Sequence, residues 1–331
     1  MIRVAINGFG RIGRITLRAL QSKNNVEVVA INDLTDVKTL THLFKYDSVH
    51  RQFQGEVSST EKGIRINGKE IRVYAESDPA NLPWHELKVD VVIESSGRFL
   101  TRETAGKHLV AGAKQVIISA PANDNTIPFV VLGVNDHLVD LTDSIISNAS
   151  CTTNCAAPMV KVLEDAVHVE SIFVSTIHSY TGDQNLHDSP HKDLRRARAA
   201  ANSIIPTSTG AAKAMGKIFP HLEGHLGGAG IRVPVINGSL TDLTCIVRSN
   251  IDQAGVNELF RKAAAAGSLK GILEYTEDPI VSSDVIGNPH SCVFDADLTS
   301  VIGKMVKVVG WYDNEAGYSN RMADLVAMLK Y

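Results

Sequence analysis

Short apolar runs and longer amphipathic stretches alternate through the first half of the chain. The apolar runs have the length of strands, and most are separated by a glycine turn or a helical stretch. Runs without polar alternation are typical of parallel strands whose two faces are covered by helices. The pattern predicts helices from the first glycine turn to Leu20 and over Arg102–Ala111, and strands at Ile2–Asn7, Val26–Ile31, Val89–Ile93, Val116–Ser119, Phe129–Leu132 and Ser144–Ser147.

One segment of the first half has a different pattern. Between Ile64 and Val73, alternating residues flank Asn67-Gly68, a pair that favours the tight turn of a hairpin. We therefore expect an antiparallel excursion within the otherwise parallel sheet.

The pattern changes after Cys151, where longer, partly alternating strands dominate. Strands are predicted at Ser171–Ile177, Ile231–Val235, Ser239–Val247 and Met305–Tyr312, and helices at Gly210–Ile218, Gln253–Ala266 and Tyr318–Lys330. A long polar loop without periodicity spans Ser179–Ser203, and loops of this length in compact domains are usually functional. The second half is thus expected to be an α+β domain with a mostly antiparallel sheet.

Composition narrows the class of protein. The 331 residues are enough for two domains, and 44% hydrophobic with 21% charged residues is an ordinary globular composition. A formal net charge of −3 argues against nucleic acid as the main partner. The sequence contains neither a long uninterrupted apolar stretch nor a signal-peptide pattern, so we expect no membrane partner and a cytoplasmic location.

The glycine turn after the first strand is a dinucleotide-binding pattern. Gly8, Gly10 and Gly13 form GxGxxG between a strand and a helix, a context that makes this otherwise weak motif specific. The first glycine permits the turn, the second lets a pyrophosphate approach, and the third lets helix and strand pack closely. The amides of Arg11 and Ile12 would then face the pyrophosphate from a helix N-terminus. We expect a Rossmann-type domain over residues 1–149, joined by the C-terminal helix 315–331, and a catalytic domain over 150–314.

Asp33 follows the second strand, 20 residues after Gly13. A carboxylate at this place binds the adenosine ribose hydroxyls and repels a 2′-phosphate, so NAD is favoured over NADP. The alternative is an Asp that serves only a turn or a helix cap.

Cys151 lies where a strand meets a helix, and helix amides are expected to lower the pKa of such a thiol. Taken alone, a cysteine in this position is more often a small buried residue. Cys155 lies four residues further on, but no histidine has a matching ligand spacing, so no metal site is expected. His178 ends a strand and precedes the long loop, which makes it the natural base for Cys151.

These residues belong to segments that closely resemble phosphorylating glyceraldehyde-3-phosphate dehydrogenase over the whole chain. The segments that resemble this family are residues 5–14, 147–155, 178–181, 193–200, 206–213 and 311–315, of which SNASCTTNC at 147–155 is highly specific.

The resemblance implies a two-step reaction. The Cys151 thiolate attacks an aldehyde, His178 takes the proton, and a hydride passes to NAD. Inorganic phosphate then splits the resulting thioester, so that glyceraldehyde 3-phosphate becomes an acyl phosphate.

The resemblance also implies the binding residues. Thr181 and Arg232 would hold the phosphate of the substrate, and Arg196 would lie near both anions. The groups implied for inorganic phosphate are Ser150, Thr152, Thr209 and Gly210. Asn314 would fix the nicotinamide carboxamide, Ser119 would contact the cofactor, and the chain would form a homotetramer.

Two positions differ from the usual pattern of this family, and two alternative functions remain to be considered. Ala316 stands where the family usually has a bulky aromatic residue, which predicts weaker nicotinamide packing, and Ser77 replaces a basic residue near the adenine. Erythrose-4-phosphate dehydrogenase uses a similar Cys and His without efficient phosphorolysis. A non-catalytic NAD-binding regulatory module is the other alternative, but it would have no need of Cys151, His178 and Arg232 together.

Overall fold

The computed structural model describes residues 1–331, which form two compact units. The first unit comprises Met1–Val130, Leu138–Ala149 and Ser319–Tyr331, and the second comprises Val131–His137 and Ser150–Tyr318. The segment Val131–His137 groups with the second unit, which differs from the division drawn from the sequence. No helix combines the length and the apolar character needed to cross a membrane.

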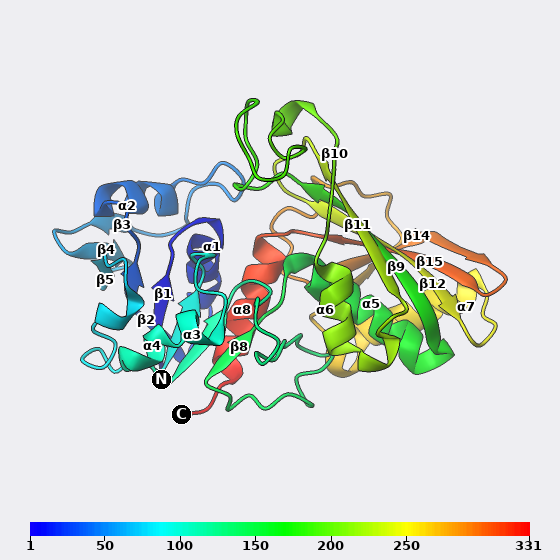
Figure 1. Ribbon diagram of the computed structural model, residues 1–331, viewed down its shortest axis with the longest axis horizontal. Coiled ribbons are helices and arrows are strands. Elements are labelled where there is room, and N and C mark those ends of the chain that lie inside the picture. Colours follow the sequence, from blue (N-terminus) through cyan, green and yellow to red (C-terminus); the bar gives the residue numbers. More distant parts are fainter. The chain divides into compact units, whose positions relative to one another are not determined.

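The first unit is built on an eight-stranded sheet in the order β3-β4-β5-β2-β1-β6-β7-β8 (Figure 1). From β5 to β8 neighbouring strands are parallel, whereas β3, β4 and β5 are antiparallel at one edge. The strands are β1 (Ile2–Asn7), β2 (Val26–Asn32), β3 (Val57–Ser59), β4 (Gly63–Ile66), β5 (Lys69–Tyr74), β6 (Val91–Glu94), β7 (Gln115–Ile118) and β8 (Ile145–Ser147). A parallel order with β1 at its centre brings the glycine turn to the carboxyl edge, where dinucleotides bind in such folds.

The predicted hairpin joins β4 to β5. Asn67 and Gly68 have φ angles of +49° and +82°, and Ile66 pairs with Lys69 across the turn. Two successive positive φ angles are what a two-residue hairpin turn requires, and glycine meets that requirement without strain. The antiparallel excursion is therefore confirmed.

The first unit contains the predicted helices after the glycine turn and at the C-terminal end, together with α2 (Val37–Lys45) and η1 (Pro79–Asn81), which were not predicted. The others are α1 (Arg11–Leu20), α3 (Arg102–Ala105), α4 (Lys107–Val110) and, from Ser319 onward, α8 (Ala316–Met328). The helix expected over Arg102–Ala111 is divided at Gly106. The strand expected over Phe129–Leu132 is wrong: only Phe129 bridges to Ser147, and the chain then turns, with Val134 N–H donating to the Val131 carbonyl.

The second unit contains a seven-stranded sheet in the order β10-β11-β9-β12-β15-β14-β13. Four of its six pairings are antiparallel, while β11 with β9 and β13 with β14 are parallel. Its strands are β9 (Val169–Ser179), β10 (Ile205–Thr207), β11 (Leu226–Val233), β12 (Ser239–Val247), β13 (Leu273–Thr276), β14 (Cys292–Ile302) and β15 (Met305–Tyr312). The mostly antiparallel sheet agrees with the expected fold class.

Helix α5 packs against strands in the middle of this sheet, α7 packs against β14 and the edge strand β13, and α6 packs against β11 (Figure 1). The helices are α5 (Cys151–Val167), α6 (Ala211–Ile218), α7 (Gln253–Ala265), η2 (Ala200–Asn202), η3 (Pro220–Leu222) and η4 (Gly267–Leu269). Pro158 lies inside α5 without ending it. Strand β14 was not predicted from the sequence. Its register shifts between Asp295 and Ser300, which interrupts the alternation of polar and apolar residues.

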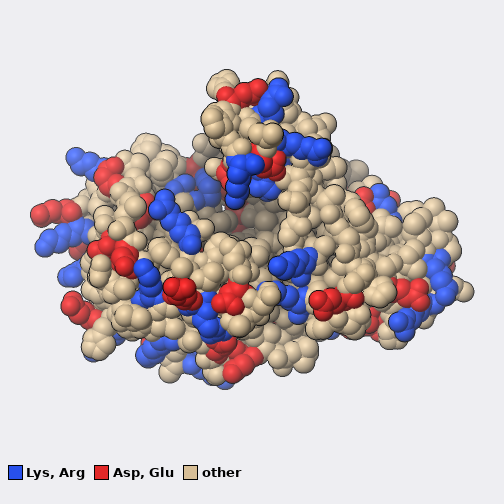
Figure 2. All heavy atoms as spheres, in the orientation of Figure 1, with Lys and Arg blue, Asp and Glu red and all other residues tan.

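On the face shown in Figure 2, Lys and Arg side chains are interspersed with Asp and Glu. This mixture of both signs fits the formal net charge of −3.

Candidate functional site

Cys151 is the first residue of α5. Ser150 caps this helix: its Oγ accepts from the Thr153 amide at 3.1 Å and contacts Thr153 Oγ1 at 2.8 Å. The preceding Ala149 has a φ of +52°, a left-handed conformation that is costly for a residue with a Cβ. The chain thus turns sharply before the helix and places the thiol at its N-terminus.

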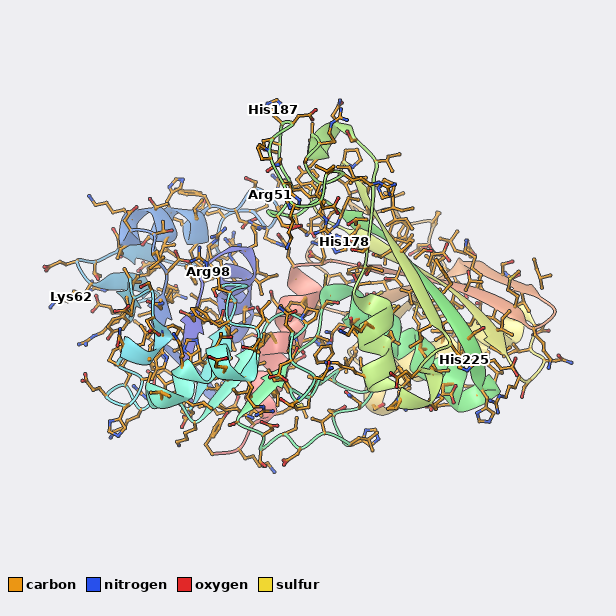
Figure 3. All side chains as sticks on the ribbon, viewed as in Figure 1. Arg51, Lys62, Arg98, His178, His187 and His225 are labelled. Atoms are coloured by element: carbon orange, nitrogen blue, oxygen red, sulfur yellow. The ribbon has the colours of Figure 1, made fainter.

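His178, labelled in Figure 3, comes from the end of β9. Its Nε2 lies 3.4 Å from Cys151 Sγ, and its Nδ1 lies 2.7 Å from the Ser179 carbonyl oxygen. A carbonyl oxygen can only accept, so we assign the ring proton to Nδ1. Nε2 then carries the lone pair and can accept the thiol proton, which is the relation of a base to its nucleophile.

The protonation of this pair differs from the sequence expectation. Burial raises the pKa of Cys151 to about 11, although Arg232 and the Thr152 amide pull it down. Burial and the charge of Arg232 lower the pKa of His178 to about 4. Amides at the start of the helix would lower the pKa of the thiol, but desolvation disfavours the charged thiolate and has the larger effect. At neutral pH the pair rests as thiol and neutral imidazole, and His178 must take the proton when the sulfur attacks.

Arg232 is placed beside the pair by strand register. In the parallel ladder of β11 and β9 it lies opposite His178. Its Nη1 donates to the Ser179 carbonyl at 3.0 Å and to Thr181 Oγ1 at 3.2 Å. The structure therefore brings Arg232 and Thr181 together next to the base, as an anion site there would require.

Arg196 is held by its neighbours in the long loop and on β10. Its Nη1 pairs with Asp183 Oδ2 at 2.6 Å, and its Nε donates to Thr207 Oγ1 at 3.0 Å. The charges of Arg196 and Asp183 both act on the pKa of Arg232, so these two groups lie within electrostatic reach of Arg232.

Thr209 and Gly210 precede α6. Gly210 occupies the N-cap position and provides no side-chain cap, while Thr209 Oγ1 accepts from the Ala211 amide at 3.2 Å. Amides in the first turn of a helix favour anions. A Cβ at Gly210 would meet nothing within 4 Å, so the space beside this turn is open.

The glycine turn in the first unit fits a dinucleotide. Gly8 has a φ of +90°, and a Cβ there would lie 2.4 Å from the Ser96 nitrogen. A Cβ on Gly13 would lie 2.2 Å from the Gly8 oxygen, so this glycine permits close packing. At Gly10 a Cβ would meet nothing within 4 Å. Protein packing therefore explains two of the glycines, and the third leaves the surface open for the approach of a ligand.

Asp33 is tied to this turn. Its carboxylate accepts from the Phe9 amide at 2.8 Å and from the Thr35 amide at 3.0 Å. Each oxygen accepts one of these bonds, and a carboxylate oxygen can accept another, so ribose hydroxyls can still be received. Asp33 therefore has the turn role that the sequence left as an alternative, and its carboxylate can also accept the ribose hydroxyls that the sequence predicts as its ligands.

The other dinucleotide candidates are positioned at the same edge of the first unit. The Arg11 guanidinium pairs with Asp47 at 2.5 Å. Ile12 lies in the first turn of α1, and Ser119 follows β7 with its amide bonded to the Glu94 carbonyl. No group of three or more His, Cys, Asp or Glu residues is arranged to hold a metal ion.

Comparison with known proteins agrees with this geometry. Residues 2–102 match the family model for the glyceraldehyde 3-phosphate dehydrogenase NAD binding domain, and residues 150–314 match the model for the C-terminal domain. The chain is 54% identical to glyceraldehyde-3-phosphate dehydrogenase of Streptomyces coelicolor over 331 residues, covering 99% of this chain and 98% of the relative. It is 55% identical to glyceraldehyde-3-phosphate dehydrogenase 1 of Bacillus cereus and to the enzyme of Geobacillus stearothermophilus, at the same coverage.

The chain belongs to the glyceraldehyde-3-phosphate dehydrogenase family. It is an NAD-dependent oxidoreductase of glycolytic type. The non-catalytic alternative is thereby set aside, and the Cys151–His178 pair has the arrangement that such an enzyme needs.

Asn314 lies after β15, and its Oδ1 accepts from the hydroxyls of Ser179 and Ser239, each at 2.9 Å. Two residues further on, Ala316 is only 6% exposed. Ser77 is exposed, and no contact of its side chain bears on the adenine.

Sequence reasoning missed Tyr312. Its hydroxyl contacts Thr152 Oγ1 at 2.9 Å and Thr176 Oγ1 at 3.0 Å, and its ring meets His178 edge-on at 5.9 Å. It thus links the helix of the nucleophile to the strand of the base. Only the strong strand pattern of Met305–Tyr312, which ends at this residue, could have pointed to it.

Proposed function

We propose that the chain converts glyceraldehyde 3-phosphate, NAD and inorganic phosphate into 1,3-bisphosphoglycerate and NADH. The observation that carries this proposal is the 3.4 Å contact of Cys151 Sγ with His178 Nε2. Arg232 lies opposite His178 and could neutralise an anionic substrate there. A base that activates a thiol occurs in many thiol enzymes. An arginine beside that base can also bind a phosphate, so the arrangement suits a phosphorylated aldehyde.

The reaction begins at the thiol. As Sγ bonds to the aldehyde carbon, His178 Nε2 takes the thiol proton and passes it to the new oxyanion, forming a hemithioacetal. His178 then removes the proton of that hydroxyl as the C–H hydride leaves and a thioester forms on Cys151. Bound NAD supplies the acceptor for this hydride. A phosphate oxygen attacks the thioester carbon, the C–S bond breaks, and the sulfur takes back the proton that His178 holds. Forming a thioester divides one difficult step into two easier ones.

The residues around the glycine turn would hold NAD. The amides of Arg11 and Ile12 would face the pyrophosphate beside Gly10, with Gly8 and Gly13 shaping the turn. Asp33 would receive the ribose hydroxyls and disfavour a 2′-phosphate. Ser119 and Asn314 are proposed as further contacts of the cofactor. The open space at Gly10 supports this assignment.

Two anion sites are proposed in the second unit. Arg232 and Thr181 would bind the phosphate of the substrate, supported by their mutual 3.2 Å contact. The inorganic phosphate would be bound by the groups near two helix N-termini, with Arg196 near both anions; these groups are Ser150, Thr152, Thr209 and Gly210. The hydroxyl of Ser150 is already bonded to Thr153, and that of Thr152 to Tyr312. We therefore expect these residues to bind the phosphate partly through their backbone amides.

A homotetramer and a cytoplasmic location belong to the same proposal. The loop from Tyr180 to Ala199 is tied mainly to itself, for example through Arg198 Nε to Asp188 Oδ2 at 2.7 Å. Exposed apolar residues in it, such as Leu186 at 70% and Leu194 at 81%, would be covered by a neighbouring subunit.

The test is a comparison of initial rates on glyceraldehyde 3-phosphate, with NAD or NADP and with or without phosphate. NADH formation should require phosphate for sustained turnover and should be much slower with NADP. Cys151→Ser should lose turnover and retain NAD binding. Equal sustained rates without phosphate, or a clear preference for erythrose 4-phosphate, would refute the phosphorylating assignment.

A further inference from the structure

A chain of buried side chains joins the carboxyl ends of neighbouring strands in the first unit. Strands β5, β2, β1 and β6 are adjacent in the sheet (Figure 1), and the ends of β1, β2 and β6 contribute Asn7, Asn32 and Glu94. Asn32 Nδ2 lies 2.7 Å from Asn7 Oδ1, and Asn7 Nδ2 lies 2.5 Å from Glu94 Oε2. The three residues are 2%, 5% and 1% exposed, so water cannot easily replace these bonds.

The backbone of Glu76 determines how the Asn32 amide is oriented. The Glu76 amide donates to Asn32 Oδ1 at 2.9 Å, and the Glu76 carbonyl accepts from Asn32 Nδ2 at 2.9 Å. A backbone N–H can only donate and a carbonyl can only accept, so this side chain has one possible orientation. Asn32 and Tyr74 are the last paired residues of β2 and β5, and the Asn32 side chain extends this pairing to Glu76.

The orientation of Asn32 decides that of Asn7. Because Asn32 presents its amino group, Asn7 presents its oxygen to Asn32 and its own amino group to Glu94. The other end of the chain agrees: Trp84 Nε1 donates to His108 Nδ1 at 3.0 Å, which leaves the ring proton on Nε2, 3.0 Å from Glu94 Oε2. The carboxylate of Glu94 therefore accepts from both neighbours, and the whole set of bonds has a single arrangement.

This set connects the loops of the proposed NAD site. Asn7 precedes the glycine turn, and Asn32 precedes Asp33. The Asn32 carbonyl accepts from the Gly8 amide at 2.8 Å, while its side chain holds the loop after β5 through Glu76. Groups that bind a ligand keep a precise position only when hydrogen bonds behind them restrict their movement. The place of the Asp33 carboxylate relative to the glycine turn is therefore maintained by this connection.

We propose that Asn7 and Asn32 are positioning residues that set the preference of the NAD site for a ribose with a free 2′-hydroxyl. The proposal rests on the proposed function, in which Asp33 receives the ribose hydroxyls, and adds the residues that hold Asp33 in place. A carboxylate rejects a 2′-phosphate through repulsion, which requires that the carboxylate cannot withdraw. Loss of the connection should therefore weaken NAD binding and relieve part of the repulsion toward NADP.

The experiment measures binding of NAD and NADP by calorimetry in Asn7→Leu and Asn32→Leu, without turnover. Leucine is close to asparagine in shape and cannot form the bonds. We expect NAD to bind about tenfold more weakly, the equivalent of one hydrogen bond, and NADP to change less, so that the ratio of the two affinities falls at least about threefold. In rate measurements the KM for NAD should rise while the KM for the aldehyde stays nearly unchanged. An affinity ratio equal to that of the wild type in both variants would overturn the proposal, even if both affinities fell together.

Gln115→Leu is the matched control. Gln115 is 4% exposed at the start of β7, and its Nε2 donates to the carbonyls of Leu141 and Asp143 at 2.8 and 2.7 Å. It is also a buried amide that joins separate segments, but it lies at the amino end of its strand, away from the edge of the glycine turn. The control should lower the free energy of unfolding in urea and keep the NAD-to-NADP affinity ratio. An equal fall of the ratio in the control would mean that general loosening is sufficient and would overturn the proposal.

The serine variants Asn7→Ser and Asn32→Ser keep the test decisive if the leucine variants do not fold. A serine hydroxyl can satisfy one neighbour and is too short to connect two, so the affinity ratio should still fall. An unchanged ratio in both serine variants would overturn the proposal. Failure of the proposed function would be visible separately, as absent NADH formation by the wild type in the presence of NAD, the aldehyde and phosphate.

Discussion

Arg232 and His178 lie opposite each other in the ladder of β11 and β9 and donate to the same acceptor, the Ser179 carbonyl oxygen. The imidazole Nδ1 lies 2.7 Å from this oxygen, and the guanidinium Nη1 lies 3.0 Å from it. The shared acceptor orients the base, and the nearby positive charge disfavours the imidazolium form. Burial and, to a smaller extent, this cation lower the pKa of His178 and keep it neutral, and Arg232 remains available for an anionic substrate.

Replacing His178 should change how thiol reactivity depends on pH. His178 is neutral above a pKa of about 4, and Cys151 keeps its proton below a pKa of about 11, so the wild-type pair holds one transferable proton between these values. Alkylation of Cys151 by iodoacetamide should therefore be nearly independent of pH between 6 and 8. In His178→Asn the rate should rise about tenfold per pH unit in this range, because only the thiolate remains reactive. A flat profile in His178→Asn would contradict the role of the base.

Arg232→Ala should weaken recognition of the phosphorylated aldehyde. Loss of hydrogen bonds to a charged group should raise KM for glyceraldehyde 3-phosphate about tenfold to a hundredfold. The KM for glyceraldehyde, which has no phosphate, should change much less. The control is Arg198→Ala, because Arg198 pairs with Asp188 within the loop. Equal losses on both aldehydes would indicate that Arg232 acts mainly through the orientation of His178.

Gly10 and Gly13 should respond differently to alanine. A Cβ at Gly13 would meet the Gly8 oxygen at 2.2 Å, so Gly13→Ala should lower the free energy of unfolding by about 1–3 kcal/mol. At Gly10 the added Cβ meets nothing within 4 Å, so the ligand-free chain should be equally stable. Gly10→Ala should instead weaken NAD binding, measured by calorimetry beside urea unfolding. Undiminished NAD affinity in Gly10→Ala would argue against the approach of the pyrophosphate at this residue.

Glu94 joins the glycine turn to the core of the first unit. One carboxylate oxygen accepts from the amide and hydroxyl of Ser96, and the other accepts from Asn7 Nδ2 at 2.5 Å and His108 Nε2 at 3.0 Å. In Glu94→Gln an NH2 group would replace one carboxylate oxygen and face two hydrogen-bond donors. We expect the free energy of unfolding, measured in urea, to fall by about 2 kcal/mol. Glu103→Gln is the control, since Glu103 is exposed, and it should stay within about 0.5 kcal/mol. Equal stability of the two variants would contradict the network.

Much of the first unit follows from its sequence because its determinants are local. The GxGxxG turn, the Asn67-Gly68 hairpin and the apolar strands each depend on residues close together in the chain. Phe129–Leu132 shows the limit, since an apolar run can be buried without pairing as a strand. The sequence also paired Cys151 with His178, two residues that are individually ordinary, because a thiol at a strand-to-helix junction and a histidine at a strand end occur together with the dinucleotide motif. The resemblance then supported this pairing.

Only the tertiary structure decided how distant residues meet. The register of β9 against β11 places Arg232 beside His178, the start of β12 brings Ser239 to Asn314, and Tyr312 spans from β15 to both Thr152 and Thr176. The sequence predicted a lowered pKa for Cys151, whereas burial in the folded chain raises it, because burial depends on everything packed around the sulfur. The sequence by itself determined the turns, the periodicities and the residue types, which are encoded over a few neighbouring positions. Strand register and desolvation arise from contacts over long sequence separations, so they appeared only with the folded chain.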